Sequence, residues 1–212
     1  MNYSPTLFDF IVGVLLVIGL LRGRRRGMSE ELLILIQWLA MVAVAGLFYT
    51  HVATFIVSAG LSQLYANIWG YVSLLLAVKI LFVLVKKGTG EKLLGSDIFG
   101  PLEYYLGMIS GMIRWFCMLI VFLSLFGARL YPEAQLAAIA KQDKDVYGSA
   151  FFSRHGEMQK NIFKHSFLGP LIQKHLGFLL IKPALPSDVK SMRDSFQEKA
   201  NRDINDAMER RK

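Results

Sequence analysis

Four ionisable residues interrupt otherwise apolar stretches of the chain: Asp9, Lys79, Glu103 and Arg114. A charge at the centre of a bilayer costs about 2.5–3.5 kcal/mol on insertion scales, so each should face protein, water or the membrane interface. Their depths alone predict two ion pairs, Asp9 with Arg114 and Lys79 with Glu103. The alternative is that Asp9 and Glu103 lie at the interface, while Lys79 reaches it with its long side chain.

Other residue types that could support catalysis or metal binding do not form a recognisable site. His155, His165 and His175 are ten residues apart, which places successive imidazoles roughly 80° apart on a helix, and Pro170 interrupts the run. The single cysteine, Cys117, lies in an apolar stretch. The sequence has no Walker loop, no G-x-S-x-G and no G-x-G-x-x-G. We therefore expect no enzyme, no metal and no cofactor.

The elements that carry these residues follow from composition. The chain has 212 residues, of which 54% are hydrophobic and 19% charged, and residues 32–78 contain no Asp, Glu, Lys or Arg. As a helix that run would be roughly 70 Å long, more than twice the ~30 Å core of a bilayer. This excludes a soluble, nucleic-acid-binding or disulfide-rich protein. We predict an all-α membrane protein whose residues 1–128 form a bundle of four transmembrane helices, about 3–21, 32–50, 68–85 and 102–126.

The basic residues between these segments predict their orientation. The loop after the first span carries four arginines (Arg22, Arg24, Arg25 and Arg26), and the loop after the third carries Lys86, Lys87 and Lys92. The loops on the opposite side, 1–6 and 51–67, carry no charged residue. Because basic loops stay in the cytoplasm, both termini are predicted to lie outside it. A cleaved signal peptide is excluded, because its positive charges would precede the apolar run.

The remaining 84 residues, 129–212, hold 25 of the 40 charged residues and are predicted to form an extracytoplasmic helical tail. Residues 161–181 are apolar but contain lysines, which favours a segment lying on the membrane over a fifth span. A last amphipathic helix is predicted from apolar residues at spacings of three or four: Val189, Met192, Phe196, Ala200, Ile204 and Met208. For residues 51–67 three structures stay open: an interfacial helix, a membrane-dipping segment or an extension of the second span.

Small residues in the spans indicate close helix packing. Gly107 and Gly111 are four residues apart, a spacing that lets another helix approach. Gly19, Gly23 and Gly27 have the same spacing, and of these only Gly19 is firmly inside a span. The partner helix belongs either to the same chain or to a second copy. Near the first basic loop, Arg26 and Glu31 are close enough in sequence to tie the loop to the start of the second span.

Two segments resemble a known family. The first contains Asp9, the pair Arg26-Gly27, Glu31 and Trp38; the second, residues 102–121, contains Glu103, Gly107, Gly111 and Arg114. In this order they resemble the hallmark segments of the colicin V production protein (CvpA) family of bacterial inner-membrane proteins. Glu103 stands where the family has Asp, and Trp115 where it has a third glycine. The resemblance covers about the first 126 residues, with a weaker similarity at 166–171, and the chain beyond about 185 is expected to be an addition.

The resemblance implies a bacterial inner-membrane protein linked to colicin V production and to the integrity of the envelope, without an established reaction. We expect a non-enzymatic protein that organises membrane partners in envelope homeostasis or bacteriocin export. Expected partners are the lipid bilayer, anionic lipids at the arginine loop and an unidentified envelope or secretion protein, but no nucleic acid. The alternative is a small channel or transporter subunit, acting as a homo-oligomer, in which Asp9, Lys79 and Arg114 line a path between protomers.

Overall fold

The structure, a computed structural model, describes residues 6–89, 100–129, 151–183 and 201. Within these ranges it contains helices and no strand. The helices are α1 (Leu7–Ser58), α2 (Gln63–Thr89), α3 (Glu103–Phe126), α5 (Phe151–Lys160) and α6 (Leu168–Leu176), with short helical turns at Gly100–Leu102, Asn161–His165 and Gly177–Leu179. The long helices α1, α2 and α3 are apolar enough to cross a membrane. The prediction of an all-helical protein with membrane-spanning helices is therefore confirmed for the described residues.

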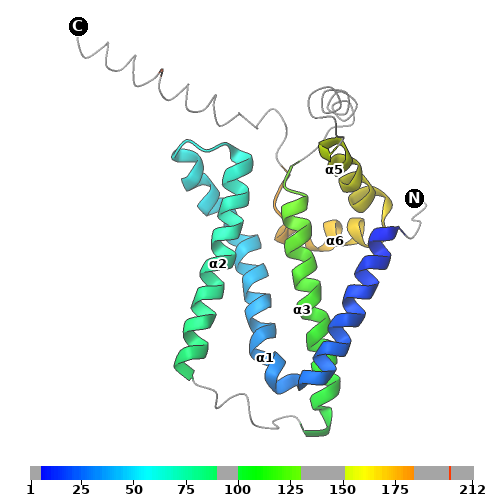
Figure 1. The fold of residues 1–212 in the computed structure, drawn as a ribbon. Helices are drawn as coiled ribbons and strands as arrows, with labels where there is room; N and C mark the ends of the chain where they lie inside the picture. The colour runs from blue at the N-terminus through cyan, green and yellow to red at the C-terminus, as the bar shows by residue number, and fades with distance from the viewer. Residues whose placement is uncertain (1–5, 90–99, 130–150, 184–200, 202–212) are drawn as a thin grey trace.

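A glycine bends α1 into two halves. Gly27 has φ 75° and ψ 171°, a backbone conformation that lies outside the helical region and that residues with a side chain rarely adopt. Residues 7–26 therefore run toward the bend and residues 28–58 return from it, as the blue and light-blue ribbons of Figure 1 show. The predicted spans 3–21 and 32–50 fall on the two halves, apart from residues 3–5, which lie outside the described residues.

The uncharged stretch 51–67 contains no separate element. Residues 51–58 continue α1 to Ser58, a short turn follows with Gly60 at φ 100°, and α2 begins at Gln63. Of the three structures left open by the sequence, the extension of the second predicted span is observed for residues 51–58, whereas residues 63–67 form the start of α2.

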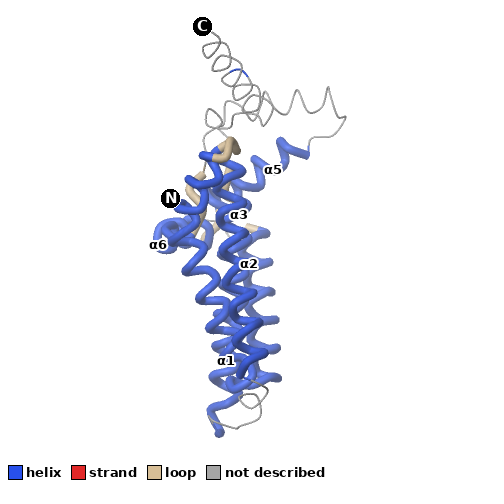
Figure 2. Tube along the Cα trace, turned by 90° about the vertical axis from the view of Figure 1, so that its left-hand side faces the viewer, coloured by secondary structure: helices blue, strands red, loops and turns tan. Residues whose placement is uncertain are grey.

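The core lies where the other long helices meet α1. α3 lies in the angle between the two halves of α1, where Val12, Val42, Cys117 and Leu123 are buried together. α2 packs on residues 28–58, and Tyr49 of α1 contacts Tyr71 of α2 edge to face. Viewed from the side, the three helices form a thin, elongated bundle with α6 near one end (Figure 2).

Residues 151–183 fold back onto the end of the bundle opposite the α1 bend. Residues 161–181 are three short pieces rather than one helix: a π-helical turn, α6 and a 3-10 turn. Ile172 and Ile181 are buried. Residues 130–150 and the predicted amphipathic C-terminal helix, except for residue 201, lie outside the described residues.

Candidate functional site

The first half of α1 and α3 are joined by interlocking glycines. Gly19 and Gly23 of α1 face Gly111 and Gly107 of α3, and the spacing of four residues is the same on both antiparallel helices. A methyl group on Gly23 would overlap the carbonyl oxygen of Gly107, and one on Gly111 would overlap that of Gly19. The backbones are therefore in direct contact, which is the use that membrane helices make of small residues. The partner helix of Gly107 and Gly111 belongs to the same chain.

The next pair in this register is Gly27 and Glu103. A side chain on Gly27 would meet Glu103 Oε1 at 2.7 Å. The carboxylate of Glu103 accepts a hydrogen bond of 2.5 Å from the Ser29 backbone amide and one of 3.0 Å from the Ser29 hydroxyl. Ser29 lies directly after the bend, where the first amides of the returning helix have no helical acceptor. Glu103 therefore caps the second half of α1 from the neighbouring helix.

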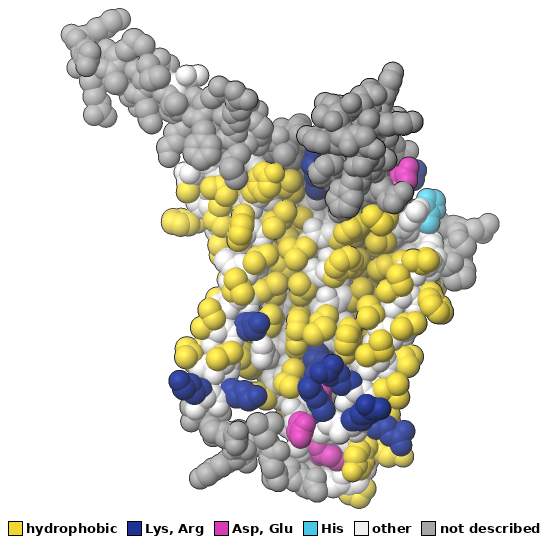
Figure 3. All heavy atoms as spheres, in the orientation of Figure 1, with side chains coloured by type: hydrophobic (Ala, Val, Ile, Leu, Met, Phe, Trp, Pro, Cys, Tyr) yellow, Lys and Arg dark blue, Asp and Glu magenta, His cyan; other side chains and the backbone are white. Residues whose placement is uncertain are grey.

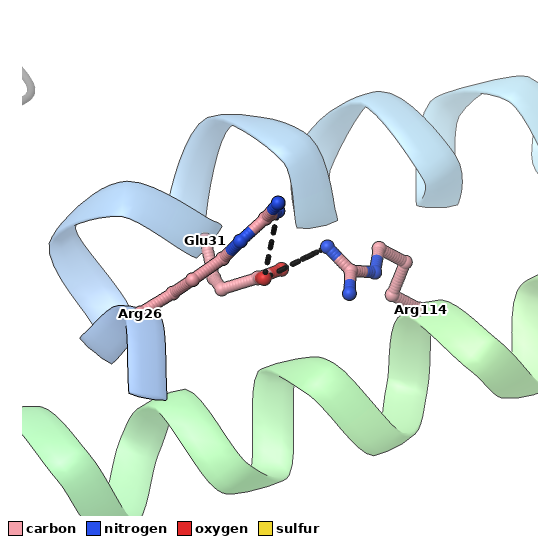
Figure 4. A network of polar contacts seen from close by, with 3 residues as sticks. All are labelled: Arg26, Glu31 and Arg114. Atoms are coloured by element: carbon pink, nitrogen blue, oxygen red, sulfur yellow. Dashed lines mark hydrogen bonds and ion pairs between the residues drawn. The ribbon is translucent and has the colours of Figure 1, made fainter. Parts of the chain in front are cut away.

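Just beyond the bend, Glu31 lies between two arginines (Figure 4). Arg114 of α3 donates from Nη1 to both carboxylate oxygens of Glu31, at 2.8 and 2.6 Å. Arg26 Nη1 lies 3.4 Å from Glu31 Oε1. The side chain of Glu31 is 0% exposed and that of Arg114 is 6% exposed, whereas Arg26 is 36% exposed. The Arg114–Glu31 pair is thus a buried connection between α3 and the second half of α1.

The predicted Asp9–Arg114 pair is wrong. Arg114 is bound to Glu31, and the glycine register explains why Asp9 is out of reach. Arg114 is level with about residue 16 of α1, which is seven residues from Asp9, or roughly 10 Å along the helix axis.

Asp9 instead ties the start of α1 to the segment that folds back. Its carboxylate accepts hydrogen bonds from the backbone amides of Phe167 and Leu168, each at 3.1 Å, and from the Thr6 amide at 2.9 Å. Asp9 therefore caps the N-terminal ends of both α1 and α6.

The predicted Lys79–Glu103 pair is also wrong. Glu103 is 8% exposed and bound to Ser29, as described above. Lys79 lies on an exposed position of α2, and no ion pair joins it to another described residue. Both α2 and α3 pack on residues 28–58, which lie between them in the view of Figure 1.

The residues of the first basic loop separate into two groups. Arg22, Arg24 and Arg25 are exposed, whereas Arg26 contacts Glu31, the contact expected from the sequence. Trp38 is partly buried and packs against both core clusters. Sequence reasoning missed three hydroxyl-bearing residues, Ser29, Tyr49 and Ser124. Tyr49 accepts a hydrogen bond from the backbone amide of Lys182, and Ser124 accepts one from that of Ile181. The sequence around an isolated hydroxyl residue in an apolar helix does not indicate which group its hydroxyl will bind.

The described residues provide little for metal or covalent chemistry. No three of their His, Cys, Asp and Glu side chains gather at one point. His165 and His175 lie on exposed positions, and the side chain of His155 is outside the described part. What this arrangement can do is hold three helix segments at fixed separation through close backbone contact, a capped bend and a buried ion pair.

Comparison with known proteins places these features in one family. The family model described as "Colicin V production protein" matches residues 8–175. The match includes the bend, the glycines, Glu31 and Arg114, and it continues through α5 and most of α6, further than the 126 residues expected from the sequence. No curated protein matches. No solved structure matches.

Proposed function

The chain belongs to the colicin V production protein family, and from this premise we propose that it is a non-enzymatic inner-membrane protein that organises partner proteins. Its role would be in envelope homeostasis or in the production and export of a bacteriocin. The observation that carries the proposal is the buried Arg114–Glu31 pair. A charge that serves transport is expected to face a water-filled cavity. Here both charged groups are enclosed and neutralise each other, which suits a rigid frame.

We propose a four-span topology in which α1 supplies two spans and both termini lie outside the cytoplasm. Support comes from the bend at Gly27, which turns residues 28–58 back along the bundle. Further support is the position of the basic side chains: Lys and Arg gather at the end of the bundle where α1 bends, below a broad apolar surface (Figure 3). A reporter active only in the periplasm, fused after residue 140, should be active. A fusion that is active only in the cytoplasm would contradict the topology.

The arginine loop provides a surface for anionic lipid. Arg22, Arg24 and Arg25 are exposed at the bend, and each basic residue near a charged membrane surface contributes about 1 kcal/mol. We propose that these three side chains hold the bend at the cytoplasmic headgroups, while Arg26 is engaged by Glu31.

Crosslinking in native membranes tests the organising role. The wild-type protein should crosslink reproducibly to one or a few envelope proteins. A Gly23→Leu variant, which separates α1 from α3, should lose these crosslinks at equal expression. A Gly13→Leu variant should keep them, because a Cβ atom at Gly13 has no other atom within 4 Å and the position faces open space.

A liposome experiment addresses transport. Purified wild-type protein should give no ion or solute flux above that of empty liposomes. Flux that disappears in Arg114→Ala, together with the absence of crosslinked partners, would refute the organising role and establish the channel or transporter alternative.

A further inference from the structure

A cavity of about 240 Å³ lies at the end of the bundle away from the α1 bend. Four of the residues that line it are apolar: Leu123 near the end of α3, together with Phe163, Leu180 and Ile181. Its two walls are the segment 156–164 and the segment 173–183. The cavity therefore lies between the returning segment and the membrane helices, where α3 ends.

Hydrogen bonds fix both walls to the bundle. The side-chain nitrogen Nε2 of Gln159 donates a hydrogen bond of 2.6 Å to the backbone oxygen of Arg129, just beyond the end of α3. On the other wall, the backbone amide of Ile181 donates to Ser124 Oγ and that of Lys182 to the Tyr49 hydroxyl, each at 2.9 Å. The cavity is thus held open by anchored backbone.

The charged residues that line the cavity in the described part of the chain are basic. Lys160, Lys164 and Lys182 line it, and no described Asp or Glu does. Each ammonium group has three N–H donors, so a lysine that already has one partner still has donors for an anion. Lys182 is exposed, and the neighbouring lining residues Leu180 and Ile181 are buried. A ligand that combines an anionic group with an apolar part therefore matches this lining.

Position and size narrow the class of ligand. Leu123 and Gly127 mark the end of the apolar segment Gly100–Phe126, which is the depth of a lipid headgroup. The volume is below the roughly 300–1,000 Å³ of sites that enclose a whole small molecule. A headgroup and the first carbons of its chains would fit, with the rest of the chains in the bilayer. We propose that this cavity binds the phosphate-bearing headgroup of an anionic membrane lipid through Lys160, Lys164 and Lys182.

The test measures lipid binding by the full-length protein in a neutral detergent. Dihexanoylphosphatidylglycerol should raise the Tm of the wild-type protein in a saturable way, because a ligand that binds the folded state stabilises it. Dihexanoylphosphatidylcholine and inorganic phosphate should not. Replacing the three cavity lysines with glutamine should weaken the apparent Kd for phosphatidylglycerol by roughly 100-fold.

Two controls separate the cavity from general charge attraction. The first replaces three exposed lysines of α2 with glutamine, Lys79, Lys86 and Lys87, and removes the same charge. It should leave the apparent Kd within about twofold of the wild-type value. The second control keeps every lysine and adds bulk to the lining through Gly177→Leu. Gly177 lines the cavity, and a Cβ atom there has no other atom within 4 Å, so the position can accept a side chain. This variant should lose most of the lipid effect, whereas Gly13→Leu should not.

Four results would overturn the proposal. Equal Tm shifts with phosphatidylglycerol and phosphatidylcholine would show that the phosphate charge is not recognised. A wild-type Kd in either the cavity-lysine variant or Gly177→Leu would place binding elsewhere. An equal loss in the α2 variant would reduce the effect to net charge. An equal shift with inorganic phosphate alone would identify a free phosphate as the ligand. If the cavity-lysine variant does not fold, Gly177→Leu still decides.

Discussion

Removing the charge of Glu31 should destabilise the protein more than removing that of Arg114, although the two residues bind each other. In Glu31→Gln, Arg114 is left buried without an anionic partner. Arg26 cannot take the place of the lost carboxylate, because it is also positively charged. With Arg114→Gln, Glu31 keeps Arg26 at 3.4 Å. The two single variants are therefore not equivalent.

The magnitudes follow from burial. Removing one partner of a buried ion pair costs about 3–5 kcal/mol, and we expect this range for Glu31→Gln because Glu31 is 0% exposed. For Arg114→Gln we expect about 2–3 kcal/mol, since the half-exposed Arg26 compensates Glu31 only partly. Replacing both residues with leucine should bring the protein back to within about 1 kcal/mol of the wild type, because no buried charge remains.

The assay is equilibrium unfolding in mixed micelles of a neutral and a denaturing detergent, followed by helical circular dichroism. Glu30→Gln serves as the matched control, because Glu30 is the neighbouring carboxylate and is exposed. Its free energy of unfolding should stay within about 0.5 kcal/mol of the wild-type value. A larger loss for Arg114→Gln than for Glu31→Gln would refute the role assigned to Arg26. A double leucine variant as unstable as the sum of the singles would refute the pair itself.

Three further predictions concern the contacts around this pair. Gly23→Ala should lower the free energy of unfolding by about 1–3 kcal/mol, because the added methyl group overlaps α3, while Gly13→Ala should change it little. The same unfolding assay compares the two variants, and equal effects would contradict the close approach of α1 and α3. Gly27→Ala should cost about 1–2 kcal/mol from its positive φ alone, and a neutral result would argue against the bend. Asp9→Ala should leave α1 folded but speed hydrogen exchange at the amides of Phe167 and Leu168, measured by mass spectrometry; unchanged exchange would show that Asp9 does not hold α6.

Hydropathy was sufficient to predict the helical class and the approximate positions of the apolar helices, because burying 20 apolar residues in lipid dominates the energetics of each segment. The contact between Arg26 and Glu31 was also predictable, since five residues across a turn bring two side chains together. The interaction partners of Asp9, Glu103 and Arg114 could not be predicted from the sequence. Depth in a membrane specifies one coordinate, whereas a contact also requires the facing direction of each helix and the register between helices.

The returning segment 151–183 shows a second reason why structure could not be predicted from the sequence. Its helices are short and contain Gly and Pro, so they carry neither the length of a span nor a long amphipathic period. The segment is fixed by hydrogen bonds to Asp9, Tyr49 and Ser124, each more than 50 positions away in the sequence, and by the burial of Ile172 and Ile181. Such contacts have no local signature in the sequence.

The regular spacing of the glycines also has a consequence for how the helices are assembled. Because the glycines repeat every four residues on both helices, sliding α3 by four residues, about 6 Å, would place Gly111 at Gly23 and Gly107 at Gly27. The slipped alignment would keep two glycine pairs, but it would place Trp115 level with Gly19 and Gly107 level with the non-helical Gly27. The slipped alignment would carry Glu103 away from Ser29 and Arg114 away from Glu31, breaking the hydrogen bonds that depend on them. The polar residues therefore reinforce the observed alignment of the two glycine-bearing helices against a slip by four residues.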